Sequence, residues 1–258
     1  INANAPVNGV RPVATVGNIT EIRSTGKRAS DRVTVAFNAR YMPRRILGMV
    51  MYQYTNSRNF ADSPTALPSD STNPDADWGP SAMDVRHRIF FNFNAPLANG
   101  VRLGLNVQGS SPLPYTITTG LDGNGDTVFN DRPAGVGRNS ARGAAQWSTN
   151  MRLSKSFPLG GTRSGPPGMP PLPPPPSGGG AMNQRVGGGG PGGGDGPQMV
   201  VMEMTNARYR LDVFLNIQNA FNNVNYNAFI GNQLSQFFGQ ATSAAAPRRV
   251  EVGFSLGF

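Results

Sequence analysis

The last nine residues, Val250-Glu-Val-Gly-Phe-Ser-Leu-Gly-Phe258, decide the fold. Apolar side chains alternate here with polar or small ones, which is the pattern of a β-strand with one apolar and one polar face. The same period of two recurs upstream, and helical periodicity prevails nowhere over a comparable length. We therefore predict an all-β fold with eight strands, near residues 12–24, 30–41, 45–58, 84–96, 100–118, 143–158, 205–219 and 248–258.

The lengths of these strands and of their connections favour a membrane barrel. The strands span roughly 10 to 16 residues, whereas strands of soluble sheets average about 5 or 6 and tilted membrane-spanning strands need about 9 to 11. Tight turns at Met42–Arg44 and Leu97–Gly100 alternate with long polar loops at 59–83, 119–142 and 220–247. Short turns on one rim and long loops on the other are typical of outer-membrane barrels.

The arginines of the strands occupy the polar parity, where a watery lumen could hydrate or pair them. Aromatic residues gather near the strand ends, as in the aromatic girdles of membrane barrels. We therefore predict an antiparallel transmembrane β-barrel with long polar loops. The arginines that we expect to face its lumen are Arg32, Arg40, Arg86, Arg88, Arg102, Arg152 and Arg210.

The composition excludes several classes of function. The chain has no cysteine and one histidine, which excludes disulfide scaffolds, thiolate metal sites, thiol nucleophiles and multi-histidine metal sites. No nucleophile motif accompanies His87, for which we expect a structural role near a membrane interface. The net charge is +9, but the arginines are spread over the strands without interleaved stacking motifs, which argues against nucleic acid as a partner. We expect neither enzymatic activity nor a cofactor.

One segment differs from all others in composition. Between Pro158 and Pro197 there are 15 Gly and 11 Pro in 40 residues, too many for a packed core. We interpret 159–197 as a disordered insert, either a solvated tether or a ligand for a proline-binding module. It separates residues 1–158, which hold the first six predicted strands, from residues 198–258, which hold the last two.

The loop at 119–142 contains the D-x-N-x-D spacing of a calcium loop, in Asp122, Asn124 and Asp126. Thr127 stands where that motif requires Gly, and Pro133 stands where it requires a bidentate Glu. Three interpretations are open: a plain polar turn, a looser surface-loop calcium site and an EF-hand-like site. We favour the plain turn and predict no metal.

Several motifs resemble the C-terminal barrel of TonB-dependent outer-membrane receptors, and within that family the Oar-like branch. The resemblance extends from about Val13 to Phe258, interrupted by the Pro/Gly-rich insert. It implies a location in the bacterial outer membrane, contacts with lipid and with the barrel-assembly machinery, and a plug domain and TonB as partners of the complete receptor. The motifs are Asp84-Val-Arg-His-Arg88, Leu113-Pro-Tyr-Thr116, Gly120-Leu-Asp-Gly-Asn-Gly-Asp126, Asn130-Asp-Arg-Pro133 and Asp212-Val-Phe-Leu-Asn216.

Two functions are compatible with these features. The first is uptake of a scarce, unidentified solute by the barrel of such a receptor, whose plug and first strands are not evident here. The second is a small structural or adhesive outer-membrane barrel in which eight strands close on themselves without transport. In both, the alternating C-terminal strand resembles an outer-membrane assembly signal, with Phe254, Leu256 and the terminal Phe258 as its recognition residues.

Overall fold

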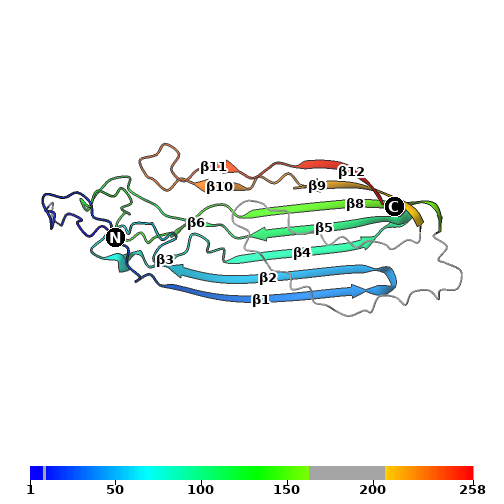
Figure 1. Cartoon of the computed structure of the whole chain (residues 1–258), viewed down its shortest axis with the longest axis horizontal. Coiled ribbons are helices and arrows are strands. Elements are labelled where there is room, and N and C mark those ends of the chain that lie inside the picture. Colours follow the sequence, from blue (N-terminus) through cyan, green and yellow to red (C-terminus); the bar gives the residue numbers. More distant parts are fainter. Residues whose placement is uncertain (8–9, 163–206, 258) are drawn as a thin grey trace.

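The computed structural model describes residues 1–7, 10–162 and 207–257. Their main element is an antiparallel sheet of eight strands in the order β1-β2-β4-β5-β8-β9-β12, with β3 beside β2 (Figure 1). The described residues contain no α-helix, so the predicted all-β class is confirmed. The strands are β1 (Arg28–Tyr41), β2 (Ile46–Asn59), β3 (Gly79–Pro80), β4 (His87–Pro96), β5 (Val101–Ser110), β8 (Gln146–Thr162), β9 (Ala207–Gln218) and β12 (Arg249–Gly257).

The long connections carry the smaller elements. One ribbon pairs β6 (Pro114–Tyr115) with β7 (Ala141–Arg142), and a second pairs β10 (Tyr226–Phe229) with β11 (Ala241–Ala244). Within the described ranges, the helices are short 3₁₀ turns, and none is long and apolar enough to cross a membrane.

The two predicted tight turns are present. Short 3₁₀ turns at Met42–Arg44 and Ala98–Gly100 connect β1 to β2 and β4 to β5. Arg45 (φ 49°) and Asn99 (φ 59°) adopt left-handed backbone conformations there, which reverse the chain within a few residues. These turns and the end of β12 lie at one end of the sheet, whereas β3 and β6 lie in the loops toward the other end (Figure 1).

The strand predicted at 12–24 was wrong. Only Thr20 in this segment makes a β-bridge, with Asn2. The segment instead wraps around the fully buried side chain of Asn4, whose Nδ2 donates to the carbonyls of Val13 (3.1 Å), Val16 (2.9 Å) and Gly17 (2.8 Å). These carbonyls bind an amide side chain, so the segment is a coil organised by one asparagine.

Two predicted strands have other boundaries. The predicted 100–118 strand ends at Ser110, because Pro112 and Pro114 lack the N–H that a ladder requires. The predicted 84–96 strand begins only at His87, because Asp84 lies in a turn and accepts a hydrogen bond from the Ser57 backbone N–H (2.9 Å).

The boundary of the Pro/Gly-rich insert also differs from the expectation. β8 continues through Thr162, four residues into the expected insert, and pairs with β9 across a register shift between Leu159 and Thr162. Gly160, with φ +79°, supplies the left-handed backbone in this irregularity. Most of the insert lies outside the described residues, as do residues 205 and 206 of the predicted 205–219 strand.

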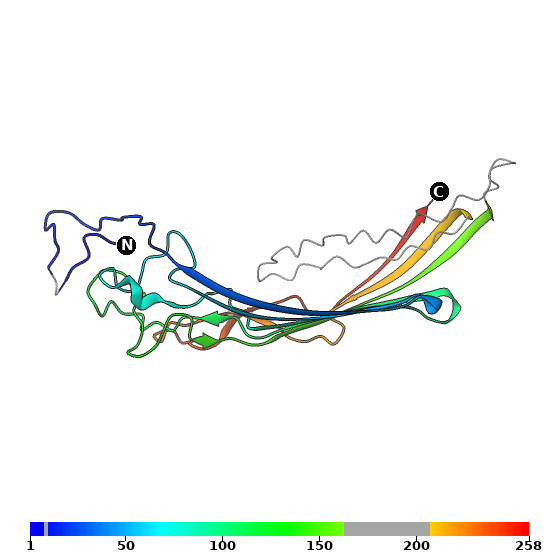
Figure 2. The same ribbon diagram turned by 90° about the horizontal axis from the view of Figure 1, so that it is seen from below.

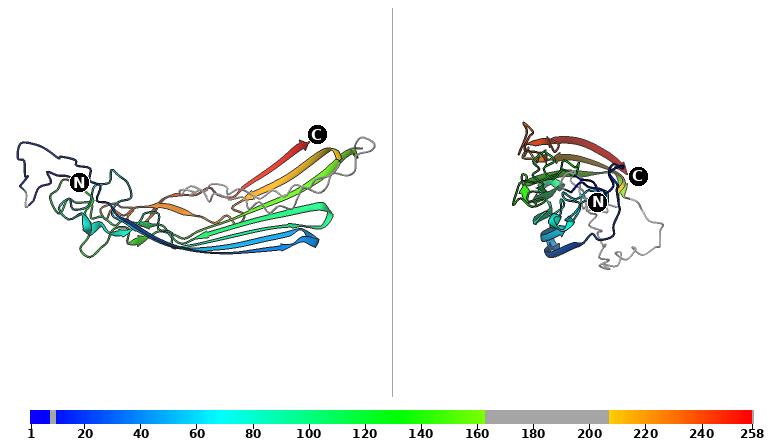
Figure 3. Two further views of the ribbon diagram at one scale, coloured as in Figure 1. Left: turned by 60° about the horizontal axis from the view of Figure 1, so that its bottom comes forward. Right: turned by 90° about the vertical axis from the view of Figure 1, so that its left-hand side faces the viewer.

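The sheet is open, so the described residues do not close into a barrel on their own. β1 and β12 are its two edges and do not pair with each other. The sheet is strongly curved along its strands (Figure 2), and viewed from one end the strands lie on an arc from β12 to β1 (Figure 3).

The cross-strand register gives the sheet two chemically different faces. Phe37, Val50, Phe91 and Val107 are paired in one row across β1, β2, β4 and β5. We call the side of the sheet that carries this row the apolar face. The sheet has no core of its own, because the buried apolar residues of the described part are only Ala5, Val85 and Ala95.

Candidate functional site

Six of the seven arginines predicted to face a lumen lie on strands and share one face of the sheet. Directly paired residues project from the same face, as do residues two apart in a strand. Arg88 is paired with Gln53 and Ser110, and Arg152 is paired with Gly104 and Asn216. We call this side the arginine face, and it carries Arg32, Arg40, Arg88, Arg102, Arg152 and Arg210.

Arg86, the seventh arginine, precedes β4 and belongs to the loops. Its Nε lies 3.4 Å from Oδ2 of Asp84, and its carbonyl accepts a hydrogen bond from the Thr55 backbone N–H (3.0 Å). The backbone of Arg86 therefore extends the β2–β4 pairing by one hydrogen bond before the start of β4. The charge of its side chain is partly compensated by the Asp84 carboxylate.

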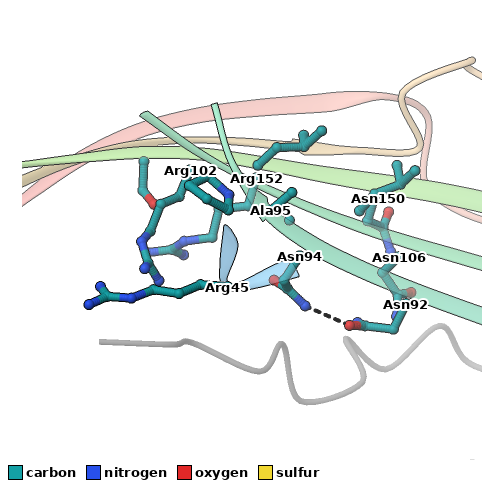
Figure 4. Close-up of a pocket in the computed structure, with 13 residues that line it drawn as sticks. Arg45, Asn92, Asn94, Ala95, Arg102, Asn106, Asn150 and Arg152 are labelled. Carbon is teal, nitrogen blue, oxygen red and sulfur yellow. Dashed lines mark hydrogen bonds between the residues drawn. The ribbon is translucent and has the colours of Figure 1, made fainter. Parts of the chain in front are cut away.

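A pocket lies on the arginine face toward the tight turns (Figure 4). Its charged side chains are Arg45, Arg102 and Arg152, and none of the described aspartates or glutamates lines it. Four asparagines supply its amide groups: Asn92, Asn94, Asn106 and Asn150.

Interactions within the arginine face hold Arg152 in place. Its Nη1 donates to Oδ1 of Asn216 (3.1 Å), and its guanidinium stacks over the ring of Phe214, 4.3 Å from the centroid. Asn94 Nδ2 donates to Oδ1 of Asn92 across 2.7 Å, as the dashed line in Figure 4 shows. The pocket therefore presents ordered cations and amides, which suit anionic or hydroxyl-rich ligands.

Buried ion pairs organise the long loops at the opposite end. The Asp84 side chain is fully buried and accepts a hydrogen bond from Arg142 Nη2 (2.7 Å). Although burial alone would raise the pKa of the Asp84 carboxyl, the Arg142 guanidinium and the Ser57 N–H lower it below its usual value. Asp84 therefore remains ionised and joins the β4 entry to β7.

Two further arginines link the loops. Arg138 contacts Asp62 Oδ2, Asn59 and the Asp77 carbonyl, and Arg132 pairs with the Asp77 carboxylate. Burial opposes ionisation of Asp62, but the Ala82 N–H, the Asn139 and Asn59 amides and the Arg138 charge together lower the pKa of its carboxyl. The loops are thus cross-linked by paired charges.

Sequence reasoning missed most of this loop network. It singled out Asp84 and Arg132 as parts of motifs but did not pair them, and it did not include Asp62, Asp77 or Arg138. One feature of the sequence could have indicated the network: arginines that stand among Asn, Asp and Gly in long loops are suited to buried bidentate contacts. Their partners lie more than 50 residues away, so spacing could not identify them.

The predicted assembly residues lie on the edge strand β12. Phe254 and Leu256 share the apolar face with Val252, and Phe254 is 81% exposed. Phe258 lies outside the described residues. Assembly itself stays a prediction.

His87 belongs to an exposed aromatic cluster. Its Nδ1 lies 2.7 Å from the Tyr52 hydroxyl, and its ring packs against Tyr52 and Tyr54, with centroid separations of 6.1 and 5.5 Å. Polar rings with an apolar body are suited to a membrane interface.

Asp122, Asn124 and Asp126 lie together in the loop between β6 and β7. Within the described residues, no group of three or more histidine, aspartate or glutamate side chains is placed to hold a metal ion. Any cation at this loop would have to use amide and main-chain oxygens as well as carboxylates.

Comparison with known proteins gave no relative: no family model, no curated protein and no solved structure matches this chain.

Proposed function

We propose that this chain forms part of the wall of a transmembrane β-barrel in a bacterial outer membrane, and that the barrel is the transport portion of a TonB-dependent receptor. One observation carries the proposal: a single-layered sheet of long strands exposes an apolar face on one side and bears an arginine face on the other.

Lipid explains the exposure of the apolar face. Phe37 is 68% exposed, Val252 76% and Phe254 81%, and no described element covers them. Contact with water would forfeit about 25 cal/mol for each Å² of apolar surface. Acyl chains remove that surface from water without a second protein layer, so the membrane takes the place of a core.

The arginine face supports a water-filled interior. An arginine on the lipid side of a barrel costs about 2–4 kcal/mol at the midplane. Six arginines on one face are therefore compatible with a membrane only if that face lines a lumen, where water, a plug domain or a solute can solvate them. The Arg102 and Arg152 pocket gives this lumen a preference for anionic surfaces.

The sheet edges favour a large barrel over the small adhesive one. Seven long strands alternate in direction along the sheet, so β1 and β12 run the same way (Figure 1). Closing the sheet on itself would need a parallel pair, whereas outer-membrane barrels are built from even numbers of antiparallel strands. Both edges therefore suit pairing with further antiparallel strands.

The faces can be tested with two neighbouring residues of β4. A spin label on Phe91→Cys should be accessible to oxygen dissolved in lipid, and a label on Asn92→Cys should be accessible to a water-soluble nickel chelate. The chain has no other cysteine, so each label reports one position. Equal access of the chelate to both labels would contradict the barrel wall.

A second experiment separates the two functions. Cysteines introduced at Val35 in β1 and Val252 in β12 should not be joined within one chain by a short bismaleimide if further strands lie between them. Efficient intramolecular cross-linking would indicate the small closed barrel. For transport, replacing Arg88 and Arg152 with Gln should change solute uptake or plug docking while the barrel still assembles.

A further inference from the structure

The loop at 122–131 turns its side-chain oxygens inward. Asp122 accepts hydrogen bonds from the backbone N–H groups of Asp126 (3.0 Å) and Thr127 (2.8 Å), and Asn124 Oδ1 accepts one from Asp126 (2.9 Å). Asp131 Oδ2 accepts from the N–H of Gly123 (2.6 Å). The side chains of Asp122, Asn124 and Asp131 therefore bind the backbone of their own loop.

Asp126 is the exceptional member of this loop. It is 3% exposed, and its Oδ1 accepts one hydrogen bond from the Val128 N–H (2.9 Å). Its Oδ2 is buried and has no hydrogen-bond partner in the described structure. Burial and the negative charges of Asp122 and Asp131 raise the pKa of the Asp126 carboxyl, because nearby carboxylates disfavour its ionised form. Leaving such a group unpaired costs free energy.

A second side-chain oxygen of the same loop, Asn130 Oδ1, is also buried without a hydrogen-bond partner in the described structure. Asn130 Nδ2 donates to the carbonyls of Leu67 (3.1 Å) and Pro68 (3.3 Å), which fixes the orientation of the amide. Two of the four buried side-chain atoms that lack a partner in the described structure therefore lie four residues apart in this loop.

The backbone also removes one objection raised by the sequence. Thr127 occupies the position at which a calcium loop requires Gly, and it adopts φ 72°. The loop therefore makes the left-handed turn that Gly would normally provide, although a β-branched residue is strained there. The absence of Gly does not prevent the loop from closing.

We propose that the 122–131 loop binds one Ca²⁺ ion, with Asp126 Oδ2 as its central carboxylate ligand and Asp122, Asn124 and Asn130 completing an oxygen site. Ca²⁺ accepts six to eight oxygen ligands and tolerates irregular mixtures of carboxylate, amide and main-chain carbonyl. This mixture is needed here, because no three carboxylates of the described residues are placed to share one ion. Mg²⁺ demands a tighter octahedron and retains its water, so it fits such a mixed loop less well.

The bound ion would fix the loops to one another. Asn124 Nδ2 donates to the Ser69 carbonyl (2.8 Å), and Asn18 Nδ2 donates to Thr127 Oγ1 (2.7 Å). The loop thus contacts both the 60–80 segment and the N-terminal segment. An ion that orders 122–131 therefore orders both contacts, independently of whether the sheet forms a barrel.

The test is a titration of the purified full-length protein with Ca²⁺, followed by isothermal calorimetry and by limited proteolysis of the loops. We expect one ion per chain and slower cleavage with Ca²⁺ present. Asp126→Asn should weaken binding at least ten-fold, because it removes the charge of the central ligand. Asp75→Asn, an exposed carboxylate in a neighbouring loop, is the matched control and should bind as the wild type does.

Three results would overturn the proposal. Absence of binding at millimolar Ca²⁺ would mean that Asp126 is simply protonated in its buried position. Equal loss of binding in Asp126→Asn and Asp75→Asn would indicate diffuse surface charge. Displacement of Ca²⁺ by equimolar Mg²⁺ would contradict the calcium assignment. A failed titration leaves the spin-label test of the barrel wall unaffected, so the two proposals fail separately.

Discussion

Arg142 and Asp84 form the ion pair that closes the loop end of the sheet. Arg142 Nη2 lies 2.7 Å from Asp84 Oδ2, and its Nη1 donates to the Asp84 carbonyl at the same distance. One guanidinium therefore holds both the side chain and the backbone of the turn before β4. Because Asp84 also accepts from the Ser57 N–H, this pair connects β2, β4 and β7.

Asp84→Asn should loosen these loops. The substitution leaves Arg142 without its carboxylate, and breaking a buried pair costs about 3–5 kcal/mol. We expect the lower end of this range because Arg142 is 29% exposed. Denaturant unfolding should show the loss. Glu21→Gln, which breaks the exposed pair with Arg23, should leave the stability nearly unchanged, because solvent screens an exposed pair.

The loops that Asp62 and Asp84 hold together should become less stable as the pH falls. The pKa values of Asp62 and Asp84 lie lower in the folded protein than in the unfolded chain. Their contribution is therefore fully present above the unfolded value, about 4, and is lost as the pH falls through the folded values. Limited proteolysis between pH 7 and pH 3 measures this effect, and cleavage of the loops should become faster in the acid part of that range. In Asp84→Asn this dependence should be weaker, and an unchanged profile would contradict the assignment.

Ionisation of Asp126 should destabilise its loop, whereas ionisation of Asp62 and Asp84 stabilises theirs. The pKa of Asp126 is raised in the folded state, so its protonation favours folding and its ionisation at higher pH destabilises the empty loop. Without Ca²⁺, Asp126→Asn should therefore protect the loop near neutral pH. Hydrogen exchange at residues 122–131 measures this effect, and faster exchange in the variant would contradict it.

The two sheet faces should respond differently to one added charge. Val107 lies on the apolar face and the adjacent Gln108 on the arginine face. If the sheet is the proposed barrel wall, Val107→Arg should destabilise its membrane-inserted form by about 2–4 kcal/mol, whereas Gln108→Arg should cost far less. Urea-induced unfolding from liposomes compares the two variants. Equal costs would mean that the faces are misassigned.

Deleting Phe258 should impair assembly in the outer membrane. The final strand has a free edge until the barrel closes, so strand addition at the assembly machinery can capture it. If the chain forms the proposed barrel wall, the deletion should lower the heat-modifiable, membrane-inserted fraction, whereas Phe258→Tyr should be tolerated because it keeps an aromatic ring at this position. Wild-type assembly of the deletion variant would remove this support for the outer-membrane assignment.

The loop end of the sheet should face the cell exterior. Gly123 lies in the exposed part of the 119–142 loop, and a side chain added there meets no atom closer than Asp131 Oδ2 at 3.6 Å. Gly123→Cys on intact cells should react with a membrane-impermeant maleimide. Reaction only after the outer membrane is permeabilised would reverse the topology.

The sequence by itself determined the strands and their faces. Alternation is a local property with a period of two, so Val250 to Leu256 and Val101 to Val107 specify which side chains share a face before any pairing is known. The turn at Met42–Arg44 was equally local. The 12–24 segment was mispredicted because its weak alternation gave no indication that Asn4 would bind its carbonyls.

Only the tertiary structure decided the contacts of the loops and the state of the sheet edges. Asp84 meets Arg142 across 58 residues, and Arg138 meets Asp62 across 76, so no spacing rule could pair them. The burial of Asp126 Oδ2 likewise depends on how the loop folds in space. Whether β1 reaches β12 depends on curvature summed over all strands, whereas alternation in one strand fixes only its own two faces.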